Sequence, residues 1–136
     1  MRLSHIVLTG VVGYFCQNKL IAEPKDDIIK QGKVLFIEKS CALCHRTDEN
    51  VPCPAGEALK SPEFIGKFWG TKRKVHIGIG GPIKEVVLDD EYFLESIEKP
   101  FAKIVKGTIP GMAPLPTTND ERKAIMAYVK SLNKRK

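Results

Sequence analysis

The pentapeptide Cys41-Ala42-Leu43-Cys44-His45 contains the residue types that attach haem to a protein covalently. Each of the two thiols can add to one haem vinyl group and form a thioether. The histidine that follows would then lie beside the porphyrin, where its imidazole can bind the iron. We therefore expect one haem c, held through Cys41 and Cys44, with His45 as an axial ligand.

A zinc ion or a redox-active dithiol would also use a Cys-x-x-Cys pair, but neither explains the histidine at the next position. A structural zinc site would need further ligands at paired spacing, and Cys53 has no such neighbour in the sequence. A chance occurrence of the motif on a redox or metal-binding loop is the alternative to haem attachment.

The second axial position of the iron has six candidates, which are Met112, Met126, His5, His76, a lysine side chain and water. Met112 lies in the segment 108–116, where three prolines and a glycine predict a stiff loop. A stiff loop suits a weak iron–sulfur bond, because a mobile thioether would be displaced by water or lysine. Met126 falls on the apolar face of a predicted helix and suits the core. We expect Met112 to be the ligand.

An iron-bound imidazole also needs an acceptor for its second N–H group. Pro62 is suitable in kind, because its carbonyl has no competing N–H on the same residue and it lies in a turn-rich segment, 46–72. An ordinary turn proline is the alternative interpretation. That segment would form a poor core by itself, and we expect it to wrap around the prosthetic group.

The elements that must position these residues are mostly helical. Apolar residues at helical spacing predict a helix over about 25–39, with the haem motif directly after it. The alternating stretch 75–79, a Gly80-Gly81 break and the apolar run 86–88 predict a short β-hairpin. Asp89 can cap a helix from Asp90 to about Lys99.

The last predicted helix begins after a capping box, because Thr118 is followed three residues later by Glu121. Its apolar face continues to about Leu132. The expected order of elements is helix, loop, hairpin, helix, loop and helix.

Residues 1–22 are typical of an export signal. Arg2 is followed by the apolar run 6–16, which is too short to span a bilayer comfortably, and Ala22 is a suitable cleavage residue. We expect residues 1–22 to be a signal peptide and residues 23–136 to be a monohaem cytochrome c domain in the periplasm. A lipoprotein signal that ends before Cys16 is the alternative, although Phe15 is a poor match before a lipidated cysteine. An uncleaved segment that loosely anchors the chain is the third interpretation.

The chain carries a net charge of +6, which becomes +4 without Arg2 and Lys19. This charge is too scattered to suggest nucleic-acid binding, but it suits an acidic protein surface. We expect a monomer that meets redox proteins through basic residues near the haem edge, chosen among Lys67, Lys72, Arg73, Lys74, Lys99, Lys103 and Lys106.

The haem motif, the Met112 loop and the terminal helices resemble those of class I c-type cytochromes over about residues 25–132. Gly32 and Phe36 look like the family's first-helix glycine and aromatic residue, and Tyr128 like the aromatic residue of the last helix. The segment Ser61-Pro62-Glu63-Phe64 is similar to the proline segment beside the family's haem histidine. The resemblance implies an all-α fold, with three to four helices around one haem and a short β-hairpin insertion.

Segments 64–70 and 89–112 are similar to the cytochrome c domain of haem-copper oxidase subunit II. Cys53 and the proline-rich stretch 51–56 depart from that pattern. The resemblance implies an electron carrier, not an enzyme, that passes single electrons between respiratory complexes and to a terminal oxidase. The alternatives are an accessory haem domain of a dehydrogenase or reductase complex, a peroxidase with an open iron position, and a structural module without haem.

Overall fold

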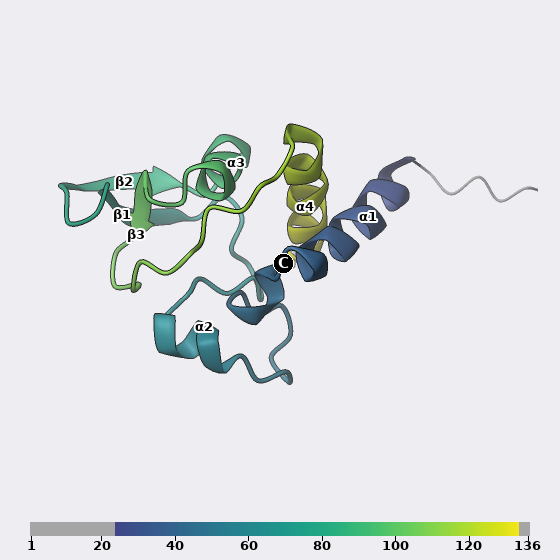
Figure 1. The fold of residues 1–136 in the computed structure, drawn as a ribbon, viewed down its shortest axis with the longest axis horizontal. Helices are drawn as coiled ribbons and strands as arrows, with labels where there is room; N and C mark the ends of the chain where they lie inside the picture. The colour runs from purple at the N-terminus through teal and green to yellow at the C-terminus, as the bar shows by residue number, and fades with distance from the viewer. Residues whose placement is uncertain (1–23, 134–136) are drawn as a thin grey trace, which may run out of the picture.

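The computed structural model of this chain describes residues 24–133 (Figure 1). Their elements, in order, are α1 (Pro24–Glu38), the short 3₁₀ helix η1 (Cys41–Leu43), α2 (Pro54–Leu59), β1 (Lys72–Ile77), β2 (Ile83–Val87), α3 (Asp90–Glu98), β3 (Lys103–Val105) and α4 (Asn119–Leu132). In Figure 1, α1 and α4 lie together, α3 lies on the side of α4 toward the strands and contacts α4, and α2 stands apart from these elements.

Helices α1 and α4 cross at very short range because α1 has a glycine at the crossing. A Cβ atom on Gly32 would lie 1.9 Å from the Ala124 carbonyl oxygen and 2.9 Å from the Tyr128 Cβ. One turn further along α1, the Phe36 ring meets the Tyr128 ring edge-on, with centroids 5.4 Å apart. The crossing therefore fixes the position in space of the C-terminal end of α1 and, with it, the start of the Cys41–His45 segment.

The strands form a three-stranded antiparallel sheet in the order β2-β1-β3. The predicted hairpin is present, with Lys72 opposite Val87 and His76 opposite Ile83. Strand β3 pairs with the other edge of β1, where Val75 lies opposite Val105. The segment that leads to Met112 is thereby tied to the sheet.

The prediction of an all-α fold is wrong, because the described residues form a mixed α and β structure that contains this three-stranded sheet. The resemblance led to treating the hairpin as a small insertion into a helical fold. The hairpin is instead the larger part of a sheet that β3 completes. A strand of three residues is too short to be recognised from alternation, and its partner lies about 30 residues earlier in the chain.

Helices α3 and α4, whose first residues are set by neighbouring capping residues, agree with the sequence prediction. Asp89 caps α3 by accepting a hydrogen bond from the Tyr92 backbone N–H at 2.9 Å. Thr118 and Glu121 form the predicted capping box at the start of α4. Helix α2 was not predicted, because it is a single six-residue segment in a stretch rich in proline and glycine.

The core lies between the crossed helices, α3 and the inner side of the sheet. Its largest fully buried side chains come from β1, from α4 and from the segment before α3, and they are Val75, Leu88, Ile125 and Val129. The rings of Phe36, Phe64, Phe68 and Phe93 form a connected aromatic cluster beside them. Within residues 24–133, no helix combines the length and apolar character needed to cross a bilayer. The expected signal peptide over 1–22, with Cys16 and the candidate ligand His5, lies outside the described residues.

Candidate functional site

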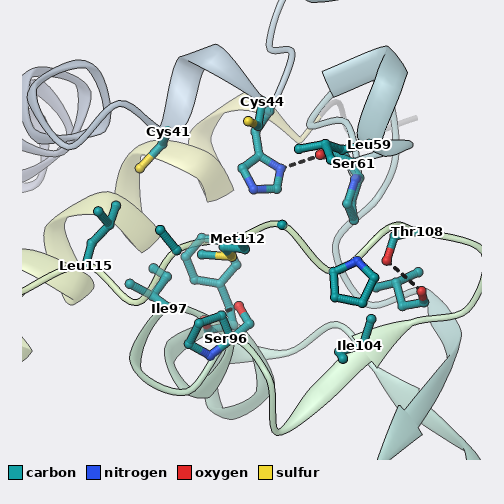
Figure 2. A pocket seen from close by; sticks show the side chains of 18 of the residues that line it. Cys41, Cys44, Leu59, Ser61, Ser96, Ile97, Ile104, Thr108, Met112 and Leu115 are labelled. Carbon is teal, nitrogen blue, oxygen red and sulfur yellow. Dashed lines mark hydrogen bonds between the residues drawn. The ribbon is translucent and has the colours of Figure 1, made fainter. Parts of the chain in front are cut away.

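A cavity of about 310 Å³ opens between the segment that follows α1, helix α3 and the loop that follows β3 (Figure 2). Its volume falls at the lower end of the range of roughly 300–1,000 Å³ that is typical of cofactor and ligand sites. Its walls are mainly apolar, with Phe36, Leu88, Phe93, Ile97 and Ile104 among them. The predicted site residues Cys41, Cys44, His45, Pro62 and Met112 all line this one cavity.

The two cysteines of the motif lie on the cavity wall as half-buried thiols that are not joined in a disulfide. Ser40, two residues after the end of α1, adopts a left-handed conformation (φ 62°), which turns the chain into η1. Burial raises the pKa of the Cys41 thiol. A redox dithiol of the Cys-x-x-Cys type needs a lowered thiol pKa, commonly at a helix N-terminus, whereas this pair follows the C-terminal end of α1.

The imidazole of His45 is oriented by the residue that the sequence suggested. His45 Nδ1 lies 2.8 Å from the Pro62 carbonyl oxygen, so Nδ1 carries the proton and donates it. The ring stacks on Phe64, with centroids 5.1 Å apart. Burial lowers the pKa of His45, and the bond to Pro62 opposes this effect. A neutral ring with Nδ1–H leaves Nε2 free to bind a metal.

Among the candidates for a second iron ligand that the structure describes, Met112 has the best position. Figure 2 shows Met112 on the loop that faces the wall of Cys41 and Cys44. Met126 packs against the core and is not part of the cavity wall. His76 also lies off this wall, and its Nδ1 donates to the Gly81 carbonyl oxygen at the hairpin turn.

Two lysines reach the cavity, and both have acidic partners. Lys39 lies 3.2 Å from a Glu121 carboxylate oxygen, and its ammonium donates to the Pro116 carbonyl oxygen. Lys103 pairs with Glu95. These contacts hold both ammonium groups in place, so neither is a better candidate for the iron than Met112.

The Met112 loop is held to α2 as well as stiffened by its prolines. The Ile109 backbone N–H donates to the Leu59 carbonyl oxygen at 2.9 Å. A Cβ atom on Gly111 would lie 3.0 Å from a Leu59 methyl group, so the glycine allows close packing. Leu59 therefore fixes the approach to Met112, a role that nothing in the sequence indicated.

Arg73 was expected at the surface, but it is half-buried and lines the cavity. Burial lowers the pKa of its guanidinium, and the nearby Tyr92 side chain opposes this. No ion pair with Arg73 occurs within the part of the chain that the structure describes. A half-buried cation beside an apolar cavity would favour a ligand that carries a carboxylate.

These side chains offer two thiols, an imidazole and a thioether to one apolar cavity, together with a guanidinium. That set can attach a planar macrocycle covalently, bind its metal from two sides and neutralise an acidic substituent. Among residues 24–133, no three His, Cys, Asp or Glu side chains gather as a metal-binding group. No family model matches the chain, and no curated protein is significantly similar to it.

Proposed function

We propose that this protein is a periplasmic monohaem c-type cytochrome that carries single electrons between respiratory complexes, with a haem-copper oxidase as the acceptor. The observation that carries the proposal is that Cys41, Cys44, His45 and Met112 line the same apolar cavity. The mixed fold is compatible with this role, because the role depends on the donors and not on the fold class.

The residues of this cavity divide into four tasks. Cys41 and Cys44 would hold the haem through thioethers, while His45 and Met112 would bind its iron. Pro62 keeps the His45 ring in one tautomer, and Arg73 is the cation available to the haem carboxylates. Bound haem iron supplies one-electron chemistry by changing between Fe(II) and Fe(III).

Electron transfer, in preference to catalysis, is supported by how firmly both ligand residues are positioned. The Pro62 carbonyl and the Phe64 ring hold His45, and the Leu59 contacts hold the Met112 loop. If His45 and Met112 both bound the iron, no iron position would be left for a substrate. Residues held this firmly would also move little when the iron gained or lost an electron. Apolar walls favour the less charged reduced state and a raised potential.

The test is to produce the chain in the periplasm of a host that attaches haem to proteins, and to measure its mass and colour after denaturation. We expect one covalently bound haem that acid-acetone does not extract. Cys41→Ala with Cys44→Ala should abolish attachment. His45→Ala should disturb the haem spectrum, whereas His76→Ala, the matched change on the hairpin, should leave it intact. A colourless wild-type protein would refute the proposal.

A further inference from the structure

Cys53 is a buried thiol outside the haem-binding motif, with 6% of its surface exposed. It is not part of the cavity wall, so it cannot serve there as a third attachment thiol. Its sulfur lies 3.2 Å from the Leu43 carbonyl oxygen and 3.9 Å from the Ala42 carbonyl oxygen. Ala42 and Leu43 are the two residues between the cysteines of the motif.

The thiol of Cys53 therefore donates to the backbone of the bridge between Cys41 and Cys44. A thiol is a weak donor, so the bond adds little to the stability of the whole protein. Its effect is local, because it fixes the direction of a carbonyl group within a bridge of only two residues. The direction of that bridge decides how the two attachment thiols face the cavity.

Gly56 shows that the contact around Cys53 is closely packed. A Cβ atom at this position would lie 2.3 Å from the Cys44 carbonyl oxygen and 2.8 Å from the Cys53 sulfur. Only glycine allows α2 to approach the motif this closely. Helix α2 thus contacts the motif through both Cys53 at its N-cap and Gly56 in its first turn.

The other end of α2 contacts the loop that carries the second predicted ligand. Leu59, labelled in Figure 2, accepts the Ile109 N–H bond and packs against Gly111, next to Met112. Pro62, which orients His45, follows three residues later. One short helix therefore connects the attachment bridge, the acceptor for the histidine and the methionine loop.

We propose that Cys53 is a positioning residue for haem attachment, whose thiol holds the Ala42–Leu43 bridge so that Cys41 and Cys44 meet the two vinyl groups. This inference rests on the proposed function. It assigns Cys53 a part in forming both thioethers, and it assigns α2 the task of keeping the bridge and the Met112 loop in register.

The experiment compares Cys53→Ala, which removes the donor, with Cys53→Ser, which keeps one. For each variant, mass spectrometry gives the ratio of doubly to singly attached haem, and a redox titration gives the potential of the loaded fraction. We expect Cys53→Ala to lower the ratio of doubly to singly attached haem by about threefold, the size expected for one weak hydrogen bond. Cys53→Ser should restore it, and Gly56→Ala should resemble Cys53→Ala.

A merely structural role is separated by Val129→Ala, which removes fully buried volume on α4 at a position outside the motif and the cavity wall. It should lower stability and leave the attachment ratio and the potential unchanged. If Cys53→Ala gives the wild-type ratio and potential, or if Val129→Ala changes them equally, the role of Cys53 is disproved while the proposed function stands. A wild-type protein that binds no haem would overturn both.

Discussion

At the scale of single residues, His45 and His76 show that an identical hydrogen bond can have different consequences. Each histidine donates from Nδ1 to a backbone carbonyl oxygen, at 2.8 Å to Pro62 and 2.9 Å to Gly81. His45 lines the cavity with two thiols beside it, whereas His76 closes a hairpin turn. The surroundings of the other ring nitrogen, Nε2, therefore decide which histidine is a candidate ligand.

The two methionines allow the same comparison by mutation. Met112→Ala should remove the weak red absorption band of ferric iron bound to methionine sulfur. It should also lower the potential by on the order of 0.1 V, since axial ligands tune haem potentials over about 0.8 V. Ready binding of carbon monoxide to the reduced variant would report the opened position.

Met126→Ala is the matched control, because Met126 packs against the core and not on the cavity wall. It should keep the red band and the potential and lose only stability. The reverse pattern, with the band lost in Met126→Ala and kept in Met112→Ala, would show that the ligand is wrongly assigned.

At the scale of elements, the position of the motif depends on the crossing of α1 and α4. The approach at Gly32 is closer than any side chain permits, and the Phe36 and Tyr128 rings meet beside it. The capping box of Thr118 and Glu121 sets where α4 begins. The two helices therefore form a fixed base from which η1 presents Cys41 and Cys44.

Gly32→Ala should be strongly destabilising, because the new methyl group would overlap the Ala124 carbonyl and the helices must separate. Overpacking in a close-packed core commonly costs about 1–3 kcal/mol, and a clash with backbone belongs at or above the upper end. Chemical denaturation of the purified protein measures the loss.

Lys33→Ala, at the next and exposed position of α1, should leave the free energy of unfolding nearly unchanged. Equal denaturation midpoints for the Gly32 and Lys33 variants would mean that the two helices are not in close contact in solution.

At the scale of the whole molecule, basic residues gather in a shallow hollow of about 490 Å³ next to the candidate haem cavity. Lys60, Lys74 and Lys106 line it together with Arg73, which also lines the cavity. The acidic residue that lines this hollow, Glu63, is paired with Arg46. A backbone bond from Lys106 to Lys74 holds two of these residues together. Lys72 and Lys103, also candidates from the sequence, are paired with Glu85 and Glu95.

This arrangement favours an approach of anionic redox partners to the Arg73 side of the cavity. Lys74→Glu with Lys106→Glu should slow the oxidation of the reduced protein by the ferricyanide anion severalfold at low ionic strength. The difference should shrink above about 0.1 M salt, where the Debye length falls to about 10 Å. Stopped-flow absorption of the haem measures the rate.

Lys33→Glu, on the exposed side of α1, is the control. It makes the same type of charge change at a residue that lines neither the cavity nor the basic hollow. It should slow the reaction far less, and the haem spectrum should be unchanged in all variants. A rate that does not respond to salt in the wild-type protein would refute electrostatic steering by these lysines.

The sequence by itself determined the features that depend on neighbouring residues. The spacing of Cys41, Cys44 and His45 indicates covalent haem attachment with a histidine ligand. The bounds of α1, α3 and α4 agree with prediction to about one residue. Caps and amphipathic faces are local properties, so they can be recognised without a fold. The hydrogen bond from His45 to Pro62 was favoured only through the resemblance of segment 61–64 to the proline segment of c-type cytochromes, because the residues alone left an ordinary turn proline open.

Only the tertiary structure decided the fold class, the role of α2 and the membership of the cavity wall. Strand β3 exists because β1 offers it hydrogen bonds across about 30 residues of chain, and its three residues carry no periodic pattern. Cys53 and Leu59 matter through contacts with segments distant in sequence. Met112 and Arg73 meet the motif in the same cavity for the same reason: long-range packing brings together side chains whose spacing along the chain has no meaning by itself.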